Sequence, residues 1–97
     1  MATYIVLANF TDQGIRSVKD SPKRAEAFKM MAKEQGCTVK EMLWTLGTYD
    51  VVTIIEAPDE MAATSLGLAI GKQGNIRTQT MRAFSAAEMA AILAKAG

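Results

Sequence analysis

Histidine is absent from the 97-residue chain, and cysteine occurs only once, at Cys37. Without histidine, the chain lacks the commonest general base near neutral pH and the commonest metal ligand. A zinc site would have to be assembled from one thiolate and carboxylates, so we expect no metal and no cofactor. A single cysteine also excludes a disulfide within the chain and favours a reducing compartment.

Long apolar runs and an excess of one charge are missing as well. No apolar segment approaches the roughly 18 residues that are needed to span a bilayer. The segment Met1–Tyr4 lacks the basic stretch and the cleavage site of a secretory signal. We therefore expect a cytoplasmic protein without a membrane partner. The net charge is +1, with both signs interspersed, which argues against nucleic-acid binding because such proteins normally carry a basic face.

Apolar residues, by contrast, are abundant and make up 49% of the chain. The length is that of one domain, residues 1–97, which buries roughly 60–65% of the surface of its unfolded chain. The apolar share is high for so small a domain. It predicts a second buried surface, which we expect to lie between subunits.

Hydrophobic periodicity and turn residues predict four strands and three helices. The predicted strands are residues 3–9, 37–46, 51–57 and 75–84, and residues 10–14 are expected to form a loop. The first helix is predicted to begin with Ser21 as N-cap and Pro22 at its first position, and to stop at Gly36. The second begins at Pro58-Asp59-Glu60 and runs to about Gly74. A capping box, Ser85-Ala86-Ala87-Glu88, predicts a short third helix.

This order predicts an α+β fold of the ferredoxin-like βαββαβ type, with an antiparallel four-stranded sheet and an extra C-terminal helix. Right-handed crossovers place strands 3–9 and 51–57 in the centre and both longer helices on one face. Both central strands are apolar on two sides, as Ile5 beside Val6 and Val52 with Ile55 illustrate. The uncovered face is therefore expected to pack on a second copy, in a dimeric α/β-barrel or a larger homo-oligomer.

Chain direction brings three segments rich in glycine and short polar residues to one end of the predicted sheet, here called the upper end. These segments are residues 10–14, 47–50 and 74–78. Asp50, Tyr49 and Arg77 would supply an acid or base, a phenol and an anion clamp. We take Asp50 as the candidate catalytic residue. The candidate ligand-binding residues are Thr11, Gln13, Arg16, Tyr49, Asp50, Arg77 and Thr78.

A structural interpretation of the same residues is also open. An Asp that follows a turn often caps that turn through its own backbone. Tyr49 would then seal the end of the core, and Asp50 would pair with Arg77. Cys37 is expected to be a buried, inert thiol, since no histidine is available to activate it. The glycines of 71–74 follow a helix, which is the wrong order for a phosphate-binding loop.

Together these motifs carry a resemblance. They are Phe10-Thr11-x-Gln13-Gly14-Ile15-Arg16, Ser21-Pro22-x-Arg24, Gly47-x-Tyr49-Asp50 and Gly74-Asn75-x-Arg77-Thr78-x-Thr80. In this combination the chain resembles the GYD family of small bacterial and archaeal proteins, from Tyr4 to about Phe84. The resemblance implies a relative of the dimeric α/β-barrels and the same candidate positions. It implies no particular reaction.

Three functions follow as hypotheses. The favoured one is a homo-oligomeric binding module that holds a small polar or anionic metabolite through Arg16, Arg77 and Thr78, oriented by Tyr49 and Asp50. The second is a cofactor-independent enzyme of the isomerase or monooxygenase type with Asp50 as its base. The third is a structural or interaction protein, for which oligomerisation is itself the purpose.

Overall fold

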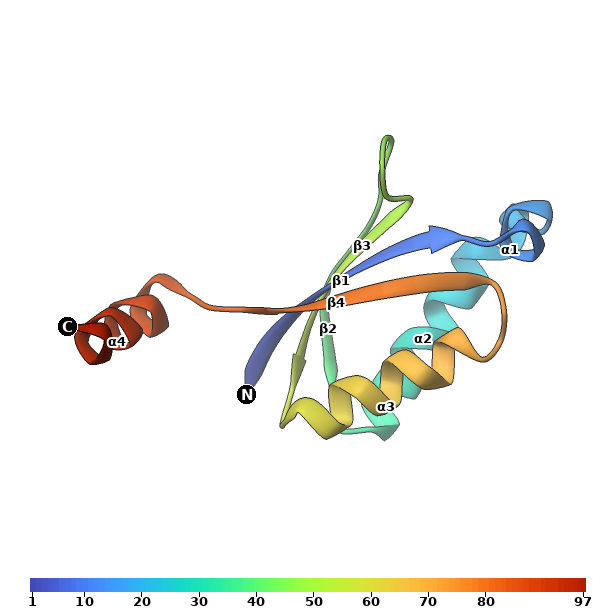
Figure 1. The fold of residues 1–97 in the computed structure, drawn as a ribbon. Helices are drawn as coiled ribbons and strands as arrows, with labels where there is room; N and C mark the ends of the chain where they lie inside the picture. Colours follow the sequence, from blue (N-terminus) through green and yellow to red (C-terminus); the bar gives the residue numbers. More distant parts are fainter.

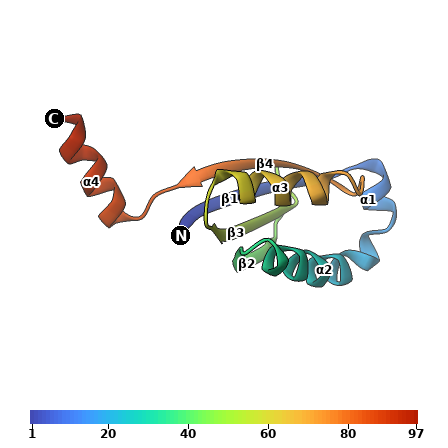
Figure 2. The same ribbon diagram turned by 90° about the horizontal axis from the view of Figure 1, so that it is seen from below.

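Four antiparallel strands form one sheet in the order β2–β3–β1–β4 in the computed structural model, which describes residues 1–97. The strands are β1 (Ala2–Phe10), β2 (Thr38–Trp44), β3 (Val51–Ala57) and β4 (Ile76–Ala83). The helices are α1 (Asp12–Arg16), α2 (Ser21–Glu34), α3 (Glu60–Gly71) and α4 (Ala86–Ala96), and a 3₁₀ turn η1 (Val18–Asp20) precedes α2. Helices α2 and α3 cover the same face of the sheet (Figures 1 and 2). The predicted ferredoxin-like fold is confirmed.

The register of β1 divides the sheet into two faces. Tyr4, Val6 and Ala8 are buried beneath the helices, and they lie opposite Ile55, Thr53 and Val51 of β3. The alternate residues of the central strands point the other way, because side chains of a strand alternate between faces. The apolar side chains of this open face are Ile5, Leu7, Leu43, Val52, Ile54 and Met81. None of these six is buried within the chain.

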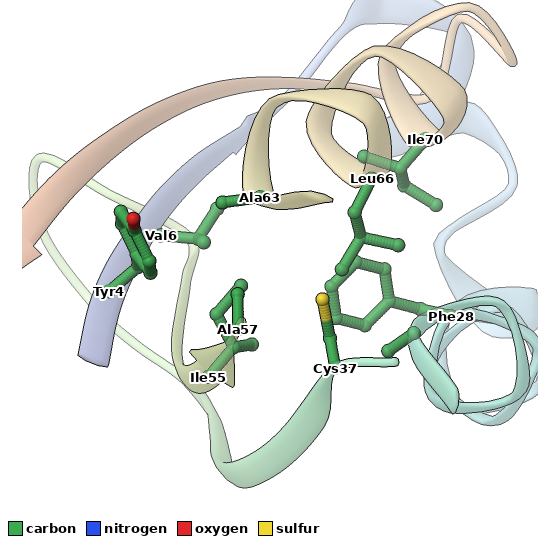
Figure 3. Close-up of a cluster of buried hydrophobic side chains, with 10 residues drawn as sticks. Tyr4, Val6, Phe28, Cys37, Ile55, Ala57, Ala63, Leu66 and Ile70 are labelled. Carbon is green, nitrogen blue, oxygen red and sulfur yellow. The ribbon is translucent and has the colours of Figure 1, made fainter. Parts of the chain in front are cut away.

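The core lies between the helix-covered face and the two long helices (Figure 3). Leu66 of α3 and Phe28 of α2 point toward one another, and the sulfur of Cys37 points toward both. Leu66 and Ile55 are the largest fully buried side chains. Cys37 is buried, as predicted, and burial together with the negative charge of Asp59 raises the pKa of its thiol. The reactive thiolate is therefore disfavoured.

Two predicted features around the first crossover are wrong. Residues 10–14 are not a plain loop, because α1 begins at Asp12 with Thr11 as its N-cap. Ser21 is not the N-cap of α2 but its first helical residue. The reason lies in tertiary structure: the Ser21 hydroxyl accepts a hydrogen bond of 2.8 Å from the indole N–H of Trp44. Asp20 takes the N-cap position without a side-chain cap.

The second crossover follows the prediction more closely at its start than at its end. The carboxylate of Asp59 caps α3 by accepting from the backbone N–H of Ala62 at 2.9 Å. The helix ends at Gly71 and not at Gly74 as expected. Gly74 instead has a φ of +84°, a left-handed conformation that suits glycine. Residues 72–75 therefore form a separate loop before β4 begins.

Helix α4 begins at the predicted capping box. The backbone N–H of Glu88 donates to the Ser85 hydroxyl at 3.1 Å, and the Glu88 carboxylate accepts from the Ser85 N–H at 2.9 Å. The second of these bonds lowers the pKa of Glu88. The helix stands away from the rest of the chain in both views (Figures 1 and 2). Its apolar residues Met89, Ile92 and Leu93 are exposed and share one helical face.

Replacing Leu66 by alanine tests the position of the core. The side chain is 1% exposed, so Leu66→Ala should lower the free energy of unfolding by about 2–5 kcal/mol, because a cavity replaces packed atoms. Leu68 is the matched control, since it lies on the same helix and is 69% exposed. Urea unfolding followed by circular dichroism measures both. Equal destabilisation by Leu66→Ala and Leu68→Ala would contradict this core.

Candidate functional site

The three polar segments do meet at the upper end of the sheet. β1 ends there at Phe10, β4 starts there at Ile76, and the hairpin between β2 and β3 turns there. Long-range hydrogen bonds tie these segments together. The Asn9 amide donates to the carbonyl of Thr48 at 2.9 Å, and the Thr11 N–H donates to the carbonyl of Asn75 at 3.0 Å. The predicted convergence is thus present in the backbone.

Asp50 links the hairpin to the end of β1. Its backbone N–H donates to the Ala8 carbonyl at 2.9 Å, and its carboxylate Oδ2 accepts from the N–H of Phe10 at 2.9 Å. Its own carbonyl accepts from the N–H of Thr45 at 2.8 Å, which closes the turn. No ion pair joins Asp50 to Arg77; the three salt bridges of the chain lie elsewhere. Asp50 therefore extends the β1–β3 pairing beyond Val51.

Thr11 and Gln13 hold α1 against the loop that precedes β4. The Thr11 hydroxyl donates to the carbonyl of Gly74 at 2.6 Å and accepts from the N–H of Gly14 at 3.1 Å. The Gln13 amide donates to the carbonyl of Gln73 at 3.1 Å and to Oδ1 of Asn75 at 3.0 Å. The contact is close, since a Cβ on Gly14 would lie 1.9 Å from the carbonyl oxygen of Asn75. Only glycine permits this approach.

Tyr49 and Arg77 lie on the open face. The Tyr49 hydroxyl donates to Oε1 of Gln79 at 3.1 Å. Arg77 is exposed and lies directly across from Asn9 on the neighbouring strand. No acidic side chain forms a salt bridge with its guanidinium. Asn9, Tyr49, Arg77 and Gln79 are called the open-face cluster below. They carry the hydrogen-bonding groups of the upper end that face away from the helices.

The other two candidate residues lie apart from this cluster. Arg16 is in the last turn of α1 and is exposed. Thr78 lies across from Ala8, on the helix-covered face, so it points away from its neighbour Arg77. The candidate residues therefore share one end of the sheet but do not line one pocket.

A cavity of about 70 Å³ lies on the helix-covered side, between the sheet and helices α2 and α3. Its lining is mostly apolar, and Thr78 is the one candidate residue that contributes to it. The other hydroxyl groups of the lining come from Ser21, Thr53 and Thr80, which sequence reasoning missed. One signal was present: Thr53 is a polar residue between the apolar residues Val52 and Ile54 of a central strand.

Two further observations concern metals and membranes. No group of three or more His, Cys, Asp or Glu side chains is arranged so that it could hold a metal ion. None of the helices combines the length and the apolar character that crossing a lipid bilayer requires.

Comparisons with known proteins agree with this architecture. The family model described as GYD domain matches residues 4–93. A protein of Thermus thermophilus, named glutamine synthetase and cystathionine beta-lyase binding protein, is 31% identical over 94 residues. That alignment covers 96% of this chain and 99% of the relative. The crystal structure of FFRP-DM1 matches with a TM-score of 0.61 at 24% identity, over 87% of this chain and all of that one, and it supports the fold alone.

Variants of Asp50 test its role as a backbone acceptor. Asp50→Ala should lower the free energy of unfolding by about 1–3 kcal/mol, because the N–H of Phe10 loses its partner. Asp50→Asn keeps an acceptor oxygen on the side chain and should lose less. Chemical denaturation of the three proteins measures the difference. If Asp50→Ala is as stable as wild type, the carboxylate does not organise the upper end.

Proposed function

Because the chain belongs to the GYD domain family, we propose that it is a small self-associating binding protein that holds a polar or anionic metabolite at the upper end of its sheet. The observation that carries the proposal is Arg77, a guanidinium without an acidic partner beside three hydrogen-bonding side chains. Guanidinium groups bind carboxylates and phosphates through paired N–H donors. Arg77 therefore favours an anionic ligand within this class.

The remaining candidate residues take different roles in this proposal. Arg77 and Tyr49 contact the ligand, and Arg16 contributes a second exposed cation at the same end of the sheet. Thr11, Gln13 and Asp50 hold the surrounding backbone through the hydrogen bonds described above. Thr78 belongs to the cavity on the other face. An enzyme based on Asp50 has less support, since the carboxylate is engaged by the N–H of Phe10.

Self-association is supported by the open face. Ile5, Leu7, Val52 and Ile54 form a continuous apolar centre, because they are paired neighbours on β1 and β3. A face of this kind is unfavourable in water, and a second copy of the same chain offers a surface of matching chemistry. In such a dimer the open-face cluster lies at the border of the contact. Exclusion of water there would strengthen the attraction between Arg77 and an anion.

Docking on other proteins is the second candidate function. Helix α4 carries Met89, Ile92 and Leu93 on one exposed face and stands apart from the sheet (Figure 2). Amphipathic helices commonly bind partner proteins through such a face. The Thermus relative is named for binding two enzymes. By analogy, we infer that this chain also binds other proteins, with α4 as one of the contact surfaces.

A charge placed in the open face tests self-association. Ile54→Glu puts a carboxylate in the apolar centre of the face, where its burial against a second copy would be strongly unfavourable. We expect this variant to be monomeric in light scattering at micromolar concentration, while wild type is dimeric or larger. Met61→Glu is the control, since Met61 is an exposed apolar residue of α3. A monomeric wild type would contradict the proposal.

Removal of the Arg77 charge tests ligand binding. Thermal shift with a panel of carboxylic acids, amino acids and inorganic phosphate should identify a stabilising anion for wild type. A ligand at 100 times its dissociation constant adds about 2.7 kcal/mol to the free energy of unfolding. Arg77→Gln should lose most of that stabilisation.

Lys72→Gln is the matched control, because it removes one exposed positive charge at the end of α3. It should respond to the anion as wild type does. Equal responses of wild type and Arg77→Gln across the panel would exclude Arg77 as the anion contact.

A further inference from the structure

The cavity between the sheet and helices α2 and α3 lies on the opposite face from the open-face cluster, and it carries an inference of its own. We propose that this cavity binds a small uncharged alcohol, aldehyde or ketone, which enters between α3 and β4 and hydrogen-bonds to Thr53. The reasons are a hydroxyl that faces the cavity without a partner in the chain, an entrance, and the size and charge of the lining.

Thr53 supplies a hydroxyl that makes no hydrogen bond within the chain. Its residue is 4% exposed, at the centre of the sheet on β3. Its hydroxyl takes part in none of the side-chain hydrogen bonds of the chain. Every polar side-chain atom that is fully shielded from solvent does have a partner. The Thr53 hydroxyl is therefore not fully shielded, and the space that it faces is the cavity that Thr53 lines. A ligand in the cavity can therefore form a hydrogen bond with this hydroxyl that no group of the chain supplies.

A second hydroxyl lies in the same row of the sheet. Val6 of β1 pairs with Thr53 on one side and with Thr80 of β4 on the other. Directly paired residues project from the same face, so both threonines face the helices. Thr80 also lines the cavity and makes no side-chain hydrogen bond within the chain, but unlike Thr53 it is an exposed residue. The row thus offers two hydroxyls to a ligand that lies over Val6.

The entrance lies between α3 and β4. A groove of about 420 Å³ runs along the outside of this gap, and it shares Ala63, Gly67, Thr78 and Thr80 with the cavity lining. The helix presents small residues there. A Cβ added to Gly67 would meet no atom within 4 Å, so the space beside this glycine is open. The groove and the cavity therefore border on the same four residues, and we take this boundary as the entrance.

Size and charge define the ligand class. A volume of about 70 Å³ accommodates roughly five to seven water-sized groups. The lining is mostly apolar and contains no acidic residue. Its one charged residue, Arg24, is engaged elsewhere, since its guanidinium donates to the Ser17 carbonyl at 2.9 Å and to the Gly14 carbonyl at 3.3 Å. A short aliphatic chain with one uncharged hydrogen-bonding group matches this lining.

The test is a titration of isotope-labelled protein with 1-pentanol, followed by amide chemical shifts. We expect saturable shifts at Thr53, Gly67 and Thr80. Thr53→Val removes the hydroxyl and should weaken binding about fivefold, as the loss of one hydrogen bond does. Gly67→Leu should abolish the saturable shifts by filling the entrance. Gly71→Leu is its control, because Gly71 lies on the same helix but lines neither the cavity nor the groove.

Several results would overturn the proposal. Absence of saturable shifts in wild type, or shifts confined to the open face, would exclude this cavity as the site. Equal affinity of wild type and Thr53→Val would exclude the hydroxyl as the contact. Tighter binding of pentanoate than of 1-pentanol would exclude the uncharged class. The amide spectrum of each variant reports whether it remains folded, so a lost response is separated from unfolding.

Discussion

The pairing of β1 on both of its sides is the constraint on which the rest of the structure depends. β3 fixes one edge of the strand and β4 the other, over nearly its whole length. Side chains of a strand alternate between faces, so a slip of one residue would exchange the buried and open sets completely. The same register places Tyr4, Val6 and Ala8 under the helices, Ile5 and Leu7 on the open face, and both threonines of the cavity row beside Val6.

The upper end is held by a frame of main-chain contacts. Asp50 joins the hairpin to Phe10 and Ala8, and Thr11 with Gln13 joins α1 to the loop before β4. These bonds occupy the polar residues that look most like catalytic groups in the sequence. What they leave exposed is Arg77, beside Asn9 and Tyr49. If Arg77 binds a ligand as proposed, this frame would hold the backbone that positions its side chain.

Much of the fold could be predicted from the sequence, because periodicity and capping are local signals; the bounds of β3 and the capping box at Ser85 follow from them directly. The predicted N-cap at Ser21 is one position too late, because the hydroxyl of this residue bonds Trp44, 23 residues away. Helix α1 is too short to show a period.

The candidate site was predicted less completely, because chain direction shows only which segments meet at the upper end. That Arg77 and Thr78 face opposite sides depends on the pairing register with β1, and the cavity depends on packing between α3 and β4, which no local pattern encodes.

Two features of the isolated chain lower its free energy of unfolding, namely the uncovered open face and the cavity. The open face keeps Leu7 and Ile54 in contact with water. The cavity of about 70 Å³ leaves the apolar side chains around it with fewer packed neighbours than a filled core would give. The proposed binding would remove both deficits, since a second copy would cover the open face and a ligand would restore contacts in the cavity. Under the proposed function the chain could retain both features, because each would become favourable once its partner is present.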